Sequence, residues 1–313
     1  MKHFNINNFI LISICLILIA LILHLLISSS FETFLYIHDK HHWIGDMMDI
    51  NKLSYNKERI ENIKVGIIDT GFDFDTPLIN LHPVHNIEHS STTEPGHGQS
   101  IAVLIGGRYN STTEFRGLIP GIKLYAYEID QNELTTSSLT NAILEMEMQG
   151  IDIISISLGT YHSSESLHKA AKKLVENGGV IIASAGNYSS MTYNYPASLE
   201  LDGVISVGAL DRKGTVLPYT TVNDRIDVYA PGDQIYIPSN FGNDLEPISG
   251  TSISTVFVTT LATLLKSKCP YLKPDEIEMH IKNNAKNFLT RWKHREVNVS
   301  LISFQQTLDK SCE

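Results

Sequence analysis

A serine at the start of a long apolar run is the first residue here that could do chemistry. Ser252 lies in ISGTSISTVFVTTLATLL (residues 248–265), which begins as a polar turn and continues as a stretch long enough for a helix. One alternative is structural: Thr251 or Ser252 caps the helix, because a hydroxyl oxygen accepts a hydrogen bond from a first-turn N–H group. The other is catalytic: Ser252 is a nucleophile at a helix N-terminus, where the dipole favours developing negative charge. A serine hydroxyl needs a base to take its proton, so other residues must decide.

Three further polar residues could complete such a site. Asp69 in GIIDTGFD and Asn187 in IIASAGNYS each follow a hydrophobic run, while His97 lies between two glycines in EPGHGQSIAVLIGG, at the start of an apolar run. Taken singly, Asp69 could cap a turn and Asn187 could form an Asx-turn. The glycines beside His97 let the backbone crowd close to a site, which is not typical of a core histidine. Together, Asp, His, Asn and Ser are the residue types that acyl transfer needs.

The elements that must position these residues alternate between strands and helices. Such alternation predicts a parallel sheet that is covered by helices on both faces. In sheets of this kind the chemistry lies at the carboxyl ends of the strands, where Asp69 and Asn187 fall. The strands are predicted at residues 64–69, 121–129, 151–158, 179–187 and 203–210, and the clearest helices at residues 137–150 and 166–179.

Five segments, in this order along the chain, resemble the subtilisin-like serine proteases: VGIIDTG, GHGQSIA, ISISLG, ASAGN and SGTSIST. They follow that family's order of Asp, His and Ser. The resemblance extends over about residues 43–290, since GLIPGIKLYAYEI and YPASLELDGVISVGAL also look like segments of the family. It implies a three-layer α/β fold with a mainly parallel central sheet and helices on both faces.

The resemblance also implies a mechanism, and it favours the catalytic alternative for Ser252. Ser252 would attack a peptide carbonyl while His97 takes its proton, and Asp69 would hold His97 in the required tautomer. The side-chain amide of Asn187 and the backbone N–H of Ser252 would form the oxyanion hole. The chain is therefore expected to be a serine endopeptidase that forms an acyl-enzyme intermediate.

Substrate binding is likewise predicted from the resemblance. Residues 157–159 would pair with the extended backbone of a peptide, and residues 184–186 would line the primary specificity pocket. Asn194 would lie near the base of that pocket, where no Asp or Glu is evident, so a strict preference for Arg or Lys is not predicted. The residues assigned to substrate binding are Ser157, Leu158, Gly159, Ser184, Ala185, Gly186 and Asn194.

Several positions depart from the family pattern. Gln99 and Ser100 follow His97 and Gly98 where a Thr-His pair is usual, which changes packing and not chemistry. Val256 stands where the family has Pro, so a pseudo-protease that binds peptides without cutting them is the alternative function. Leu78 stands where many secreted relatives have a calcium-binding Asp, so no metal or other cofactor is expected. Calcium remains an alternative, because the loop at residues 110–111 could offer oxygens.

The N-terminus predicts a membrane anchor. Residues 9–27, FILISICLILIALILHLLI, are almost wholly aliphatic and long enough to cross a bilayer as a helix. Their length favours an uncleaved segment, although the serines at residues 28–30 keep signal-peptide cleavage and secretion as an alternative. We expect residues 1–8 to be a short cytoplasmic terminus, residues 28–42 a linker and residues 43–313 an extracytoplasmic peptidase domain at the cell membrane.

The net charge of the chain indicates which classes of binding partner to expect. A net charge of −10 without a basic cluster argues against nucleic acid. We expect a monomer that binds a peptide or protein substrate and the membrane. The stretch before the first motif leaves no space for a separate propeptide, as in leader-peptidase-like members of the family. A dedicated enzyme with one precursor and a broad protease both stay open. Cys269 and Cys312 could pair, but two free thiols are an equal alternative.

Overall fold

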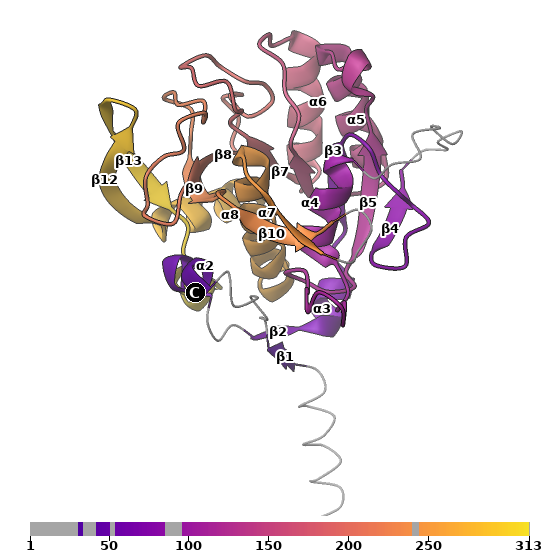
Figure 1. The fold of residues 1–313 in the computed structure, drawn as a ribbon. Helices are drawn as coiled ribbons and strands as arrows, with labels where there is room; N and C mark the ends of the chain where they lie inside the picture. The colour runs from indigo at the N-terminus through magenta and orange to yellow at the C-terminus, as the bar shows by residue number, and fades with distance from the viewer. Residues whose placement is uncertain (1–30, 34–41, 51–53, 85–95, 240–243, 313) are drawn as a thin grey trace, which may run out of the picture.

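The computed structural model describes residues 31–33, 42–50, 54–84, 96–239 and 244–312, which build an α/β domain around a nine-stranded sheet (Figure 1). The strand order is β12-β13-β9-β8-β7-β6-β3-β5-β4. In this sheet every neighbouring pair from β13 to β4 is parallel, and the edge pair of β12 and β13 is antiparallel. The predicted α/β fold with a mainly parallel central sheet is confirmed.

The central strands are apolar because both of their faces are covered. Every residue of β3, β6, β7 and β8 is buried, as expected for strands between two helical layers. The strands of the sheet are β3 (Val65–Asp69), β4 (Asn80–Pro83), β5 (Lys123–Glu128), β6 (Ile153–Ile156), β7 (Val180–Ser184), β8 (Val204–Leu210), β9 (Val228–Pro231), β12 (Lys286–Trp292) and β13 (Arg295–Leu301). Two antiparallel pairs lie outside it, β1 (Phe31–Thr33) with β2 (Ser54–Asn56) and β10 (Ile235–Pro238) with β11 (Leu245–Ile248).

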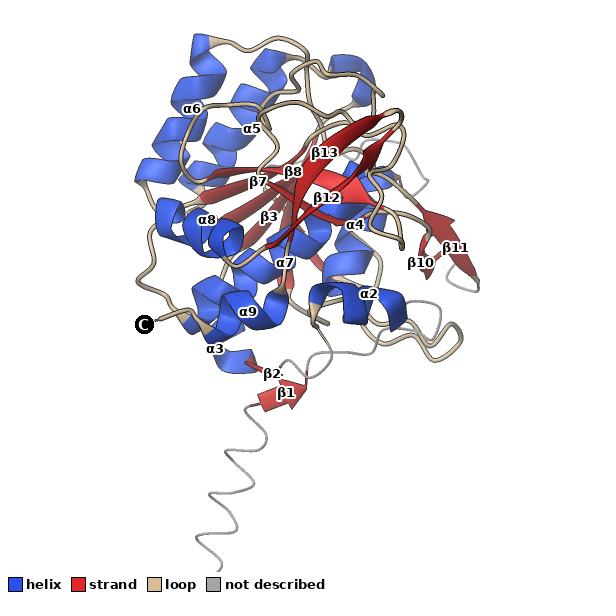
Figure 2. Cartoon of the chain, turned by 90° about the vertical axis from the view of Figure 1, so that its left-hand side faces the viewer, coloured by secondary structure: helices blue, strands red, loops and turns tan. Residues whose placement is uncertain are grey.

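The helices form two layers with separate apolar cores. Helices α5 (Thr136–Met148) and α6 (Glu165–Glu176) cover one face, and α4 (His97–Gly106) and α7 (Thr251–Lys268) pack on the other (Figure 2). The remaining helical segments are α2 (His42–Met48), α3 (Lys57–Glu61), a 3-10 turn (Gln131–Glu133), α8 (Pro274–Asn283) and α9 (Phe304–Asp309). The three predicted layers are therefore present.

The outer helices begin and end at residues whose chemistry explains the boundary. Thr135 and Ser138 form a reciprocal capping box at the start of α5, and Ser164 accepts a hydrogen bond from Leu167 N–H at the start of α6. Gly150 and Gly178 follow the two helices with φ of 64° and 92°, a left-handed conformation in which glycine has no Cβ penalty. These helices match the predicted ranges to within a few residues.

The centre of α7 is buried even though the helix carries many hydroxyl groups. The hydroxyls of Thr255 and Thr263 donate to the carbonyls of Thr251 and Thr259, four residues earlier. Ser254 donates to the carbonyl of Ala230, which ties the first turn of α7 to β9. These three hydroxyls thus bond to backbone carbonyls inside the core, whereas those of Thr259 and Thr260 have no partner among the described residues.

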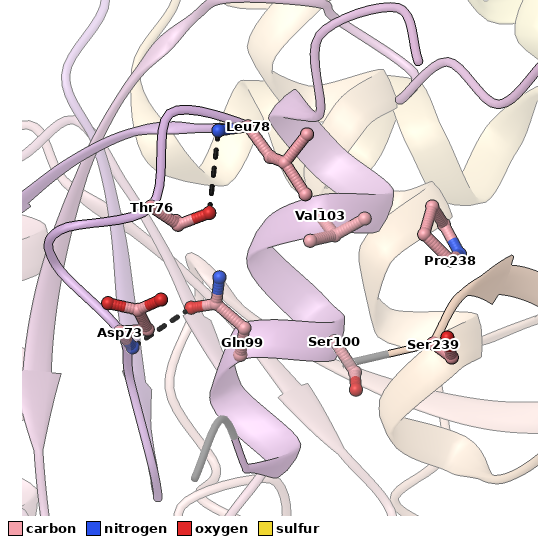
Figure 3. Close-up of a pocket in the computed structure, with 8 residues that line it drawn as sticks. All are labelled: Asp73, Thr76, Leu78, Gln99, Ser100, Val103, Pro238 and Ser239. Atoms are coloured by element: carbon pink, nitrogen blue, oxygen red, sulfur yellow. Dashed lines mark hydrogen bonds between the residues drawn. The ribbon is translucent and has the colours of Figure 1, made fainter. Parts of the chain in front are cut away.

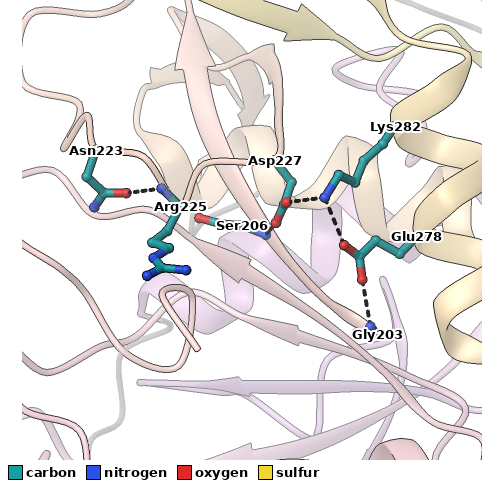
Figure 4. Close-up of polar contacts among 7 residues, drawn as sticks. All are labelled: Gly203, Ser206, Asn223, Arg225, Asp227, Glu278 and Lys282. Carbon is teal, nitrogen blue, oxygen red and sulfur yellow. Dashed lines mark hydrogen bonds and ion pairs between the residues drawn. The ribbon is translucent and has the colours of Figure 1, made fainter. Parts of the chain in front are cut away.

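An ion cluster fastens α8 to the amino-terminal side of the sheet (Figure 4). Lys282 Nζ lies 2.6 Å from Asp227 and 3.0 Å from Glu278, and Glu278 accepts a hydrogen bond from Gly203 N–H at 2.6 Å. Burial raises the pKa of Glu278 despite its bonds to Gly203 and Lys282. Asp227 also accepts from Ser206 N–H in β8, so one lysine links α8 to two strands.

Cys269 and Cys312 form a disulfide, which decides between the two alternatives left by the sequence. Cys269 is buried at the end of α7, and Cys312 follows α9, with 5.7 Å between their Cα atoms. The bridge closes a loop of 43 residues that contains α8, β12, β13 and α9. It therefore fastens the C-terminal part of the chain to the helix that carries Ser252.

No helix within the described ranges is both long enough and apolar enough to cross a bilayer. The predicted anchor at residues 9–27 and the terminus at residues 1–8 lie outside the described residues, as does most of the linker at 28–42. The membrane segment therefore stays a prediction.

We predict that Cys312→Ser lowers the free energy of unfolding by about 4 kcal/mol, since a 43-residue loop is no longer closed in the unfolded chain. Urea denaturation without a reductant measures the difference. With a reductant present, the variant and the wild type should unfold at the same urea concentration. Equal midpoints in the absence of reductant would contradict a stabilising bridge.

Candidate active site

The polar residues singled out in the sequence gather at the carboxyl ends of β3 and β7 and at the starts of α4 and α7. Asp69 is the last residue of β3, and Asn187 lies three residues beyond the end of β7. His97 is the first residue of α4, and Ser252 is the second residue of α7. Because α4 and α7 pack against each other, His97 and Ser252 lie at the starts of two neighbouring helices.

Asp69 and His97 are in direct contact. His97 Nδ1 lies 2.8 Å from Asp69 Oδ1, which also accepts a hydrogen bond from Thr70 N–H at 2.7 Å. Asp69 is fully buried, whereas 44% of the His97 side chain is exposed. Since Nδ1 faces the carboxylate, the Nε2 atom of the ring is left for a partner on the solvent side.

Two glycines make this contact possible. A Cβ on Gly71, whose φ is 67°, would lie 2.7 Å from the Cα atom of Gly96. The two backbones are also hydrogen-bonded, with Gly96 N–H donating to Gly71 O and Gly98 N–H to Thr70 O. The start of α4 therefore rests directly on the turn that follows Asp69. The expectation that glycines beside His97 allow a close backbone approach is confirmed.

The pKa of His97 reflects two opposing effects. Burial of the ring lowers the pKa, but the negative charge of Asp69 and its hydrogen bond raise it, and the net pKa lies above the ordinary value of 6.5. A histidine so placed is neutral only above this raised pKa. Its capacity to accept a proton from a hydroxyl is thus lost as the pH falls through that value.

The structure excludes the capping role that was the alternative for Ser252 and Thr251. The N-cap of α7 is Gly250, with φ of 150°, and no side chain caps the helix. Ser252 is buried, with 6% of its surface exposed. The capping hypothesis fails because Gly250 already occupies the N-cap position, which places both hydroxyl residues inside the first turn.

Asn187 is held by the residue that precedes Ser252. The N–H of Thr251 donates to Asn187 Oδ1 at 3.0 Å, and the Thr251 hydroxyl donates to the same atom at 3.1 Å. Because a backbone N–H can only donate, the amide oxygen must face Thr251, and the Nδ2 hydrogens point away from it. A Cβ on Gly250 would lie 3.0 Å from Nδ2, so only a glycine leaves this space free.

Thr251 is the functional residue that the sequence analysis did not recognise. Besides its contacts with Asn187, its hydroxyl accepts a hydrogen bond from Gly186 N–H at 3.2 Å. It therefore locks the segment after β7 to the start of α7 and orients the Asn187 amide. Its position directly before Ser252 is the signal for this role in the sequence.

The residues predicted to bind substrate also lie together. Residues 157–159 continue from the end of β6; Ser184 is the last residue of the neighbouring strand β7, and Ala185 and Gly186 follow it. Asn194 Nδ2 donates to Ser184 O at 3.0 Å. A Cβ on Gly159 would lie 2.2 Å from Asn194 Oδ1. The Asn194 amide thus contacts both segments.

The residues that depart from the family pattern lie in the core or line a small pocket. Val256 is fully buried in the unbroken helix α7. Gln99 is buried, and its Oε1 accepts a hydrogen bond from Asp73 N–H at 3.1 Å. Gln99, Ser100 and Leu78 line a small pocket between α4 and the end of β10 (Figure 3).

No metal site emerges from the part of the chain that is described: no group of three His, Cys, Asp or Glu side chains there could hold an ion. In the loop at residues 110–111, which was the alternative calcium site, Asn110 Oδ1 accepts hydrogen bonds from the N–H groups of Thr112 and Thr113.

The family follows from a match of residues 61–302 to the subtilase family, Peptidase_S8. The chain belongs to the subtilase family. Subtilisin DY from Bacillus licheniformis is 32% identical over 237 residues, which cover 72% of this chain and 84% of subtilisin DY. This subtilase is therefore a serine endopeptidase, which disfavours the pseudo-protease alternative.

Solved structures support the fold of this subtilase. MycP1 with its N-terminal propeptide removed aligns with a TM-score of 0.68 and 22% identity, over 85% of this chain and 96% of MycP1. The prenylagaramide maturation protease PagA aligns with a TM-score of 0.65 and 23% identity, over 79% and 93% of the two chains.

We predict that His97 titrates above pH 6.5 and that Asp69→Asn lowers its pKa. The substitution removes the charge that raises the pKa and leaves the burial that lowers it. Histidine NMR measures both values, with His168→Asn as a control variant far from Asp69. A His97 pKa that does not respond to Asp69→Asn would contradict the electrostatic account.

Proposed function

We propose that this subtilase cuts extended peptide segments by acyl transfer, with Ser252 as nucleophile, His97 as general base and acid, and Asp69 as the group that orients His97. The observation that carries the proposal is the 2.8 Å contact between buried Asp69 and the first residue of α4, with Ser252 at the start of the adjacent helix. This arrangement supplies each role that acyl transfer requires.

The reaction begins when Ser252 Oγ attacks the carbonyl carbon of a peptide bond and its proton passes to His97 Nε2. The carbonyl π electrons move to oxygen, which becomes the oxyanion of a tetrahedral intermediate. The Nδ2 group of Asn187 and the backbone N–H of Ser252 donate hydrogen bonds to it. As the intermediate collapses, the C–N bond breaks and His97 gives its proton to the leaving amine.

The acyl-enzyme is then hydrolysed by the same groups. His97 takes a proton from water, the water oxygen attacks the ester carbonyl, and the proton returns to Ser252 Oγ as the C–O bond breaks. Asp69 remains ionised and stabilises the imidazolium that forms in each half-reaction. The hydrogen bond from Thr70 N–H to Asp69 Oδ1 helps to keep that carboxylate in place.

The proposed location is the outer side of the membrane, with residues 9–27 as the anchor. The disulfide between Cys269 and Cys312 supports an oxidising compartment, because such bonds rarely persist in the cytosol. The substrate class is a precursor peptide that presents an extended segment. PagA, which shares the fold, is described as a maturation protease. The enzyme would act as a monomer without a metal or cofactor.

We predict that a fluorophosphonate probe labels the wild-type protein and that Ser252→Ala abolishes labelling, because only an activated hydroxyl attacks the phosphorus atom. Ser249→Ala is the matched control, since Ser249 is an exposed serine three residues earlier. In-gel fluorescence after a fixed exposure gives the comparison. Labelling that survives in Ser252→Ala, or is absent from folded wild-type protein, would refute the proposed nucleophile.

A further inference from the structure

The ends of two adjacent strands limit the space available to the substrate residue that precedes the cleaved bond. The last register pair of β6 and β7 is Ile156 with Ala183, and the chain continues from them as residues 157–159 and 184–186. We call the space between these two segments the crevice. Gly186 is hydrogen-bonded to Thr251, directly beside Ser252. Consider a peptide that lies along residues 157–159 with the carbonyl of its cleaved bond at Ser252. The side chain of the residue that precedes this bond would then lie over the crevice, and this step rests on the proposed function.

The amide of Asn194 occupies the crevice. Asn194 is 2% exposed, its Nδ2 donates to Ser184 O at 3.0 Å, and a Cβ on Gly159 would lie 2.6 Å from its Cγ atom. The adjoining backbone is fixed, because Thr160 and Tyr195 exchange two hydrogen bonds of 3.0 and 2.8 Å. The amide therefore spans the crevice from one segment to the other.

An aromatic pair bridges the same two chain segments farther along. The ring centroids of Tyr161 and Tyr188 lie 4.7 Å apart, and Tyr161 follows the 157–159 segment while Tyr188 follows Asn187. A Cβ on Gly186 would lie 3.0 Å from the Tyr188 ring. Two independent contacts, one buried and one at the surface, thus join the walls of the crevice.

We propose that Asn194 closes the crevice to large side chains, so that the enzyme cuts after small residues such as Gly, Ala or Ser. The Asn194 Oδ1 atom is buried and has no hydrogen-bond partner among the described residues. The amide is thus held by one hydrogen bond and by packing against Gly159. Replacing it with a smaller residue should open the crevice without dismantling a polar network.

The test measures second-order inactivation rates with peptidyl diphenyl phosphonates that differ only in the side chain next to phosphorus: Ala, Ser, Leu, Phe or Lys. Wild-type enzyme should react about 100-fold faster with the Ala and Ser probes than with the Phe and Lys probes. Asn194→Gly should raise the rate with the Phe probe, relative to the rate with the Ala probe, about tenfold or more.

Asn223→Ala is the matched control. Asn223 donates a similar hydrogen bond, from Nδ2 to Thr192 O at 2.9 Å, outside the crevice, so this variant should keep the wild-type preference. Circular dichroism establishes that each variant is folded. Tyr161→Ala gives a second variant, which should widen the preference without touching Asn194.

The outcomes separate this inference from the function on which it rests. Fluorophosphonate labelling with a wild-type preference for Ala and Ser probes, relaxed by Asn194→Gly, supports both. Labelling with equal or faster reaction of the Phe or Lys probe overturns the closed crevice and leaves the nucleophile standing. A preference for small side chains that folded Asn194→Gly retains also overturns the role of Asn194. Absence of all labelling refutes the proposed function and this inference with it.

Discussion

The hydrogen bond between Asp69 and His97 is the interaction on which the rest of the site depends. A fully buried carboxylate is costly unless it is paired and hydrogen-bonded. His97 and Thr70 both bind Oδ1 of Asp69, and Oδ2 has no hydrogen-bond partner among the described residues, so these two contacts stabilise the carboxylate. The same attraction outweighs the effect of burial on His97 and raises its pKa. The contact of Gly71 with Gly96 brings the two side chains within reach.

The start of α7 provides the second half of the site. Gly250 adopts a positive φ of 150°, which glycine accommodates easily, and Thr251 and Ser252 then enter the helix in succession. Thr251 faces Asn187 and Gly186, which orients the amide and fixes the end of β7. Ser252 is therefore positioned by a helix buried in the core and not by a mobile loop, as a nucleophile requires.

Much of this arrangement could be predicted from the sequence. Apolar runs that end in Asp69 and near Asn187 gave the strand ends, and the glycines beside His97 indicated a close backbone approach. The residue that caps α7 could not be decided from the sequence, because the backbone conformation of Gly250 depends on what packs around it. The disulfide could not be decided, since a separation of 43 residues says nothing of distance. The amide of Asn194 spans two strand ends only through its rotamer and Ser184 O, which no local pattern encodes.

The most direct test of this account is a crystal structure of the protein after reaction with a phosphonate inhibitor. The account predicts a covalent bond from Ser252 Oγ to phosphorus, with a phosphonyl oxygen about 2.7–3.1 Å from both Asn187 Nδ2 and the backbone N of Ser252. His97 should keep its contact with Asp69 and turn Nε2 toward the adduct. An adduct on another residue, or a phosphonyl oxygen directed away from Asn187, would contradict the central claim.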